Sequence, residues 1–361
     1  MSGQYKELSG SLGWYSDKAC TQKIKVDSAG LPVNGINTDL DLYAKQKTFV
    51  LKPGSGFNKL IPSTATSVVF TDEIMPVATT LIDVDADGDG GVVAWMDGTV
   101  MKVSTQTPGK QVIAATSCQE MFMIKSNLIS IDFSNLDTSN VINMSHMFEG
   151  CTRMTALDLT HLDTQNVTNM SHMFLACIGL TNLDLTSLDT SGVTNMALMF
   201  NGCYGLTSLD LTSFDTSKVT NMNSMFSGCK RLTSLDLSSL DTSKVTNMSS
   251  MFRDCSGLTN LDLAHLDMRN VTNISYIFFQ CDKLTALDLS SLDTRSVTNM
   301  SYMFYGCSKL INLSLGDKFT FVGSNYNLPS GTWYSSDGTA YTSDGNSCTI
   351  PNNKADTYTR R

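Results

Sequence analysis

Six aspartates recur every 26 residues, each between two leucines: Asp158, Asp184, Asp210, Asp236, Asp262 and Asp288. If the leucines point inward in a short strand, the aspartates point outward and line one face about 5 Å apart. Like charges this close repel one another, so the column needs a compensating partner. Three interpretations stay open: a solvated face whose neighbouring hydroxyls donate to the carboxylates, a binding face for a cationic or hydroxyl-rich partner, and an ion-lined ridge.

The aspartate column is almost the same in every unit, with Thr160, Thr186, Thr212 and Ser238 two positions after the first four aspartates. A surface that recognises one irregular protein varies its exposed positions, because its contacts differ from place to place. A uniform surface suits a repetitive ligand, such as a polysaccharide or a fibrous polymer, or it has no ligand. We take the six aspartates as candidate binding residues.

A second acidic cluster places four aspartates at alternate positions, Asp83 to Asp89, with glycines at 88 and 90. This carboxylate density is typical of a calcium loop. The twelfth position from Asp83 is Ala94, however, where an EF-hand has a bidentate glutamate. We therefore predict an Asp-Gly hairpin turn and no metal, with calcium near Asp83–Asp89 as the open alternative. No cofactor is predicted.

Aromatic residues gather near the end of the repeats: Tyr276, Phe279, Tyr302 and Tyr305, followed by Trp333 and Tyr334. The last unit of a stacked array exposes its core and has to be capped. Aromatic side chains also anchor many interfaces. Cap packing and a sugar or protein contact patch are both open for this group, whose first four members are further candidate binding residues.

The elements that position these residues follow the same 26-residue period, which repeats seven times from about residue 120 to 315. Leu235-Asp236-Leu237 alternates as a short strand does. Val245, Met248, Met251 and Phe252 then lie at i, i+3, i+6 and i+7, the apolar stripe of about two helical turns. This period and pattern predict an α/β repeat, a leucine-rich-repeat solenoid with one short strand and one short helix per unit.

Two further columns, one of cysteine and one of asparagine, are explained by the period. The cysteines are Cys151, Cys177, Cys203, Cys229, Cys255, Cys281 and Cys307. We expect them to be free, buried and apolar in behaviour, with disulfides or metal binding as the alternative. The asparagines, for example Asn169 and Asn247, are expected to be buried and to bond backbone groups of the next coil.

The chain divides into four predicted regions. Residues 1–48 form a small β module, residues 49–117 a β-meander extension and N-terminal cap, residues 118–315 the solenoid, and residues 316–361 a C-terminal β-rich cap. Within the extension, residues 79–84, 91–95 and 99–105 are predicted strands because turn signals such as Asp97-Gly98 separate them.

Two parts of the chain resemble known families. The Val-Thr-Asn-Met string with Met-Phe-x-x-Cys closing each unit resembles the 26-residue repeat of BspA-like bacterial surface proteins. The stretches 13–20 and 39–44 resemble the Listeria–Bacteroides repeat, a small β module of bacterial surface proteins. The resemblance implies an adhesin-type surface protein that binds host or neighbouring-cell macromolecules, and names no particular partner.

Composition excludes several classes of function. The net charge of -9 argues against a nucleic-acid partner, because binding phosphates needs clustered Lys and Arg. The sequence has no run of 18 apolar residues, so we expect no membrane insertion. No nucleophile–base set or phosphate loop indicates an enzyme. We therefore expect a non-enzymatic protein, at the cell surface or secreted, that binds an extracellular protein or polysaccharide. We also expect the chain to be a fragment of a longer one, since no signal or anchor is recognised. A structural spacer or assembly element of a surface or phage-type fibre is the alternative.

Overall fold

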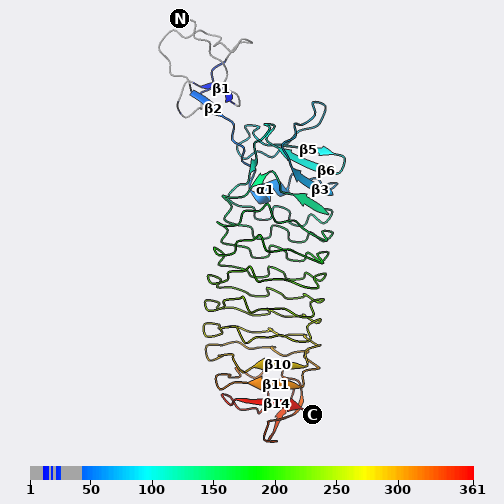
Figure 1. Ribbon diagram of the computed structural model, residues 1–361, viewed down its shortest axis with the longest axis vertical. Helices are drawn as coiled ribbons and strands as arrows, with labels where there is room; N and C mark the ends of the chain where they lie inside the picture. Colours follow the sequence, from blue (N-terminus) through cyan, green and yellow to red (C-terminus); the bar gives the residue numbers. More distant parts are fainter. Residues whose placement is uncertain (1–10, 16–17, 19–21, 26–42) are drawn as a thin grey trace.

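Stacked coils of 26 residues form most of the chain (Figure 1). The computed structural model describes residues 11–15, 18, 22–25 and 43–361. Asparagines 26 residues apart, from Asn143 to Asn299, are joined in a continuous series of parallel β-bridges, one between each pair of neighbouring coils. The predicted repeat fold is therefore confirmed.

The core of the stack is a set of buried columns, because each coil places the same apolar residue at the same position. One column consists of Phe122, Phe148, Phe174, Phe200, Phe226, Phe252, Phe278 and Phe304, all buried. Consecutive rings stack with centroids 5.6–6.2 Å apart and planes tilted by 2–25°. Offset stacking of this kind adds to the burial of apolar area that drives folding.

The prediction of one short helix in each unit is wrong. Within residues 118–315, all described, no α-helix forms, and the predicted helical segment is a series of tight turns. In the coil that begins near residue 222, the N–H groups of Met222, Ser224 and Phe226 donate to carbonyls of the next coil. The N–H groups of Met225 and Ser227 close turns onto the carbonyls three positions earlier, and the N–H of Asn223 donates to the side chain of Asn221. Bonds to the next coil thus replace the i to i−4 bonds of a helix.

Backbone angles show why a helix cannot continue through this segment. Ser224 has φ +53° and Gly228 has φ +74°, both in the left-handed region, and the equivalent positions of the other coils have the same sign. A positive φ at the third residue is the geometry of a type II turn. Two such turns per coil direct alternate N–H groups along the stack.

The predicted strand is present in only part of the array. The buried–exposed–buried alternation of Leu-Asp-Leu is found in every coil. β8 (Ser130–Asp132) at one end and β10 (Ala286–Leu289) and β11 (Asn312–Leu315) at the other are strands. In the described coils between them, the equivalent segments are not assigned as strands.

A column of buried threonines, which the sequence analysis did not single out, joins neighbouring coils. Thr190 is 1 % exposed; its hydroxyl donates to the carbonyl of Asp215 at 3.0 Å and accepts from the N–H of Asp215 at 2.9 Å. Thr138, Thr164 and Thr242 make the same pair of bonds with the next coil. Each hydroxyl satisfies two backbone groups of the next coil through bonds that are partly shielded from water, and such groups are costly to leave unpaired.

The cysteine column is free and buried, as predicted. Each sulfhydryl also donates to the carbonyl of the phenylalanine 29 residues earlier, as Cys177 does to Phe148 at 3.0 Å. The asparagine column differs from the prediction, because its members are half-buried from Asn143 to Asn273 and exposed at Asn299. Their Oδ1 atoms accept the N–H two residues later in the same coil, for example Ser249 N to Asn247 at 3.0 Å. They shape their own turn and do not bond the next coil through this atom.

A five-stranded sheet of order β4-β5-β6-β3-β8 leads into the stack. β3 (Ser67–Phe70) pairs in parallel with β6 (Val100–Ser104) and with β8 of the first coil. β4 (Ile82–Asp83), β5 (Val93–Asp97) and β6 are antiparallel neighbours. β4 and β6 lie within predicted strands, and β5 overlaps the one predicted for 91–95 but extends to Asp97. The short helix α1 (Gly54–Asn58) buries Phe57 against the same core, and β7 (Val112–Ile113) pairs with β9 (Leu136–Asp137).

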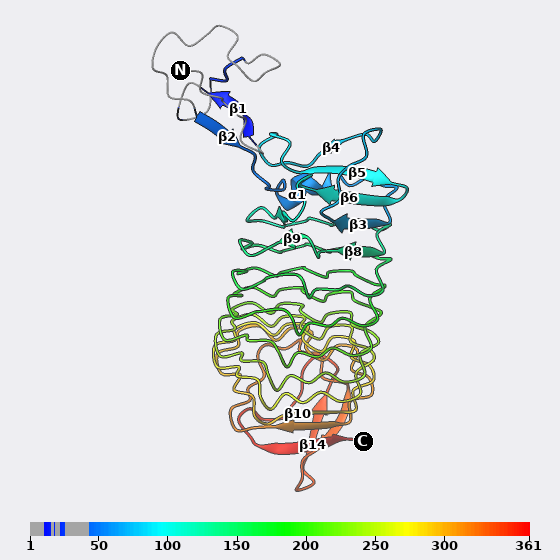
Figure 2. The same ribbon diagram turned by 45° about the horizontal axis from the view of Figure 1, so that its top comes forward.

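At the other end, a second five-stranded sheet of order β10-β11-β14-β12-β13 closes the stack (Figure 2). β14 (Asp356–Arg360) pairs antiparallel with β11 and brings Tyr358, fully buried, onto the last coil. β12 (Gly331–Tyr334) and β13 (Ala340–Ser343) form a hairpin whose Trp333 is also fully buried. These residues, and not Tyr302 or Tyr305, supply the aromatic packing of the cap.

Near the N-terminus, β1 (Ser11–Tyr15) and β2 (Tyr43–Gln46) pair antiparallel. Most of the module predicted for residues 1–48, including Cys20, lies outside the described residues. Among the described residues there is no helix long and apolar enough to cross a membrane.

Candidate ligand-binding surfaces

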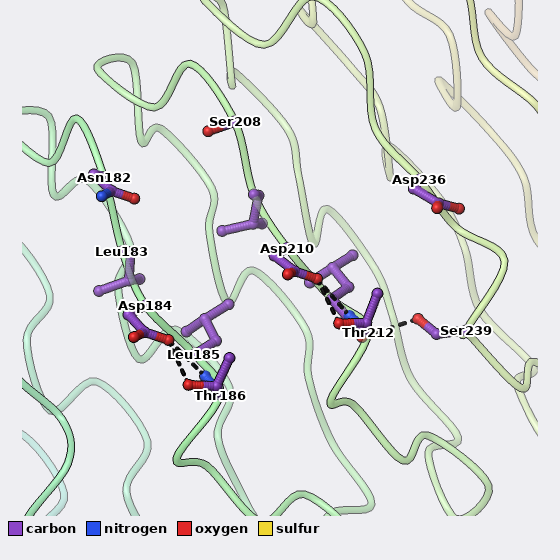
Figure 3. Close-up of a pocket in the computed structure, with 12 residues that line it drawn as sticks. Asn182, Leu183, Asp184, Leu185, Thr186, Ser208, Asp210, Thr212, Asp236 and Ser239 are labelled. Carbon is purple, nitrogen blue, oxygen red and sulfur yellow. Dashed lines mark hydrogen bonds between the residues drawn. The ribbon is translucent and has the colours of Figure 1, made fainter.

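The aspartate column lies on the surface, as its spacing predicts. Each carboxylate from Asp158 to Asp288 is exposed and is flanked by two buried leucines. Around its middle, the surface forms an open groove of about 450 Å³ lined by the Leu-Asp-Leu segments of neighbouring coils. Asp184, Asp210 and Asp236 follow one another along this groove (Figure 3), with Thr186 and Thr212 beside the first two. We call it the aspartate groove.

Hydrogen bonds fix the orientation of the groove carboxylates. Oδ1 of Asp184 accepts from the N–H of Thr186 at 3.0 Å and from its hydroxyl at 2.7 Å. Asp210 and Thr212 repeat this geometry at 2.9 and 2.7 Å. Asp262 and Asp288 accept only from the N–H two residues later. Because the turn occupies Oδ1, it is Oδ2 of each groove aspartate that a ligand can reach.

The same hydrogen bonds outweigh the repulsion between neighbouring carboxylates. The hydroxyl and the N–H of Thr186 lower the pKa of Asp184, although Asp158 nearby acts to raise it. The N–H and hydroxyl of Thr212 lower the pKa of Asp210 against the charges of Asp184 and Asp236. The groove aspartates therefore stay ionised at neutral pH. The hydroxyl donation foreseen for a solvated face exists, and it also produces a row of fixed negative charges.

Three further polar residues line the groove, and none of them was among the residues predicted from the sequence. Asn182, Ser208 and Ser239 line it together with the aspartates. The hydroxyl of Ser239 donates to the carbonyl of Leu211 in the preceding coil at 2.9 Å. The signal that could have found them is position within the 26-residue period, because residues two before and three after each aspartate flank the same groove.

The four candidate aromatic residues come together on the turn side of the last coils. Tyr276 stacks on Tyr302 and Phe279 stacks on Tyr305, each with centroids 4.9 Å apart. Tyr302 is 36 % and Tyr305 46 % exposed. The structure therefore places these four side chains on the lateral surface, outside the cap. We call them the aromatic surface.

A cation and two shallow grooves border the aromatic surface. The guanidinium of Arg253 lies 4.7 Å from the ring centroid of Phe279 and 5.6 Å from that of Tyr276. A polar groove of about 280 Å³ extends from Arg253 to Lys230, and another of about 420 Å³ lies between Tyr305 and the C-terminal cap. Arg253 is in the same column as Phe279 and Tyr305, so the 26-residue spacing could have identified it.

The acidic cluster at Asp83–Asp89 forms a compact loop between β4 and β5. Asp85, Asp87 and Asp89 each offer a carboxylate oxygen, and these three oxygens lie within 4.8 Å of one another. The turn predicted here is thus accompanied by a close approach of three carboxylates, which alternate positions along the chain alone do not establish.

Comparison with known proteins gives one structural relative and one family. A crystal structure of a T. pallidum leucine-rich repeat protein is similar at 18 % identity, covering 61 % of this chain and 78 % of that one, with a TM-score of 0.33. No curated protein matches the chain. A family model described as "Mycoplasma protein of unknown function, DUF285" matches residues 116–234 and 199–317, which together span more than half of the chain. The chain therefore belongs to the DUF285 family.

Proposed function

We propose that this protein is a non-enzymatic bacterial surface protein that binds an extended, positively charged protein segment along the aspartate groove. The observation that carries the proposal is the row of Asp184, Asp210 and Asp236, which are exposed and held in orientation by hydrogen bonds. A fixed row of like charges binds a row of opposite charges better than it binds an irregular surface.

The chemistry of these carboxylates supports binding over catalysis. A general acid that works near neutral pH needs a raised pKa. The pKa values of Asp184, Asp210 and Asp236 are instead lowered by hydrogen bonds from the residues two positions later. Such groups act as permanent anions, which attract a cationic partner.

The form of the ligand follows from the form of the groove. Because alternate side chains of an extended chain point to the same side, a peptide with lysine at every second position presents a row of cations. Each exposed ion pair is weak, but three together strengthen binding roughly tenfold. A cell-surface location agrees with the resemblance to BspA-like repeats and belongs to the same proposal.

The aromatic surface is proposed as a second contact region. Tyr302 and Tyr305 are exposed, Tyr305 lines the groove beside the C-terminal cap, and aromatic side chains commonly anchor interfaces. Arg253, which lies over Tyr276 and Phe279, adds hydrogen-bond donors for the polar part of a partner. This surface is on the turns and is distinct from the Leu-Asp-Leu segments, so the two can be tested separately.

The proposal is tested by measuring binding to three immobilised probes: the alternating-lysine peptide, the same peptide with glutamate for lysine, and a neutral polysaccharide. We expect saturable binding to the lysine peptide that weakens as salt rises, because salt screens exposed ion pairs. Tyr302→Ala with Tyr305→Ala measures the contribution of the aromatic surface. Preference for the polysaccharide would refute the cationic ligand, and no binding to any probe would favour a structural spacer.

A further inference from the structure

The loop between β4 and β5 contains a buried carboxylate oxygen that lacks a partner. Asp85 is 0 % exposed, and its Oδ2 accepts from the N–H groups of Asp89 at 2.7 Å and Gly90 at 3.2 Å. Its Oδ1 is also buried but has no hydrogen-bond partner. A buried charged oxygen without a donor is costly, so its presence needs a compensating group.

The carboxylate of Asp85 lies against two others. Oxygens of Asp85, Asp87 and Asp89 lie within 4.8 Å of one another, although Asp87 is exposed and Asp89 half-buried. Three carboxylates this close repel one another unless a cation lies between them.

Nearby lysines neutralise only part of the loop. Lys52 forms an ion pair with Asp83, with Nζ 3.2 Å from Oδ1, and donates to the carbonyl of Asp85. Lys47 donates to the carbonyl of Gly90 at 3.2 Å. Neither contact is made to the carboxylate of Asp85, so its buried Oδ1 is not compensated by either lysine.

We propose that Asp85, Asp87 and Asp89 bind a calcium ion, with Oδ1 of Asp85 as its buried ligand. Ca²⁺ takes six to eight oxygens at about 2.3–2.6 Å, so two oxygens on one ion lie up to roughly 5 Å apart, which the 4.8 Å limit satisfies. Carboxylates in a loop suit its flexible geometry. Mg²⁺ requires a nearly ideal octahedron and retains its water, so it fits this loop less well.

Calcium at this position also stabilises the junction that precedes the stack. Oδ2 of Asp89 accepts the N–H of Thr48 at 2.9 Å, and the N–H of Ala86 donates to the carbonyl of Val50. The loop therefore holds residues 47–52 in place. Neutralising the repulsion between its carboxylates stabilises the arrangement without any new contact to those residues.

The test uses the full chain, stripped of metal with a chelator and titrated with CaCl₂ in a calorimeter. We expect one calcium per chain, with an affinity on the order of 10⁻⁴–10⁻³ M, typical of extracellular modules, and a higher melting temperature with calcium. Mg²⁺ is expected to bind at least ~10-fold more weakly. Absence of binding at millimolar calcium, or equal or tighter binding of Mg²⁺, would overturn the assignment.

Variants locate the ion. Asp87→Asn changes an exposed side chain, so the loop is expected to fold while calcium binding weakens at least ~10-fold. Asp85→Asn should abolish it. Asp344→Asn is the matched control, because Asp344 also accepts backbone N–H groups in a turn, those of Asn346 and Ser347, but lies in a different loop. Wild-type affinity in both loop variants would overturn the site.

Discussion

The sulfhydryl of Cys203 donates to the carbonyl oxygen of Phe174, 3.1 Å away in the preceding coil. The equivalent contact recurs for all seven cysteines of the column. Each cysteine thus fills the core and also supplies a weak donor to a carbonyl of the neighbouring coil. The thiol must remain protonated for this contact, and burial favours that state.

Thiol reagents should leave the cysteine column unmodified in the native protein. Burial raises the pKa of Cys203 and Cys255 to about 12, so almost no thiolate forms at pH 8. Alkylation followed by peptide mapping should find Cys151 to Cys307 unlabelled, and labelled once the protein is denatured. Rapid labelling of any of the seven in native buffer would contradict their place in the core.

Stability should be highest between about pH 5 and pH 8.5. Burial raises the folded pKa of Cys203 and Cys307 from 9.0 to about 12, so the stability that these protonated thiols contribute is fully present below pH 9 and is lost as the pH rises towards 12. The pKa of Asp293 is lowered from 3.8 to about 2 by Arg295, so its stabilisation is lost as the pH falls below 4. Urea midpoints measured from pH 3 to 11 check both limits, and a constant midpoint up to pH 11 would contradict the cysteine contribution.

Thr190→Val should destabilise the stack by about 1–3 kcal/mol, because the N–H and carbonyl of Asp215 lose their buried partner. Valine has nearly the same shape, so packing is preserved. Thr194→Val is the matched control, since Thr194 is exposed and its hydroxyl donates one bond, to the carbonyl of Thr168. Thermal unfolding should separate the two by several degrees, and equal melting temperatures would show that the buried hydroxyls are dispensable.

Ser250→Gly should stabilise the protein by up to about 1 kcal/mol, because Ser250 has φ +58° and glycine adopts this conformation without penalty. The opposite change, Gly228→Ala, should destabilise it by about 1–2 kcal/mol. A Cβ there would stand in the left-handed region and 3.2 Å from the ring of Tyr204. Urea denaturation of both variants checks the signs, and a destabilised Ser250→Gly would argue against strain in the turns.

The period, the inward leucines and the buried cysteines were predictable, because side chains that repeat every 26 residues occupy equivalent positions in each coil. The helix was predicted wrongly for a physical reason. Val245, Met248, Met251 and Phe252 are all buried in the structure, so burial spaced like a helix arises here from consecutive turns. The positive φ at Ser250 decides between the two, and serine does not indicate it.

In the candidate sites, too, some features were predictable from the sequence and others were not. Alternation predicted that Asp184 and Asp210 are exposed, but the hydrogen bonds that hold them depend on turn geometry that only the structure contains. At Asp85, the sequence showed a row of carboxylates but could not show which one was buried without a partner. Contacts between coils and between distant loops are set by tertiary packing, and local pattern does not encode them.

The most direct test of the binding proposal compares two triple variants with the same change in net charge. The groove variant combines Asp184→Asn, Asp210→Asn and Asp236→Asn. The control combines Asp189→Asn, Asp215→Asn and Asp241→Asn, exposed aspartates of a second column that also accept the N–H two residues later. Binding of the alternating-lysine peptide should weaken about tenfold in the groove variant and less than about twofold in the control. Equal weakening in both variants would contradict the proposal, because net charge and not the groove would then explain the binding.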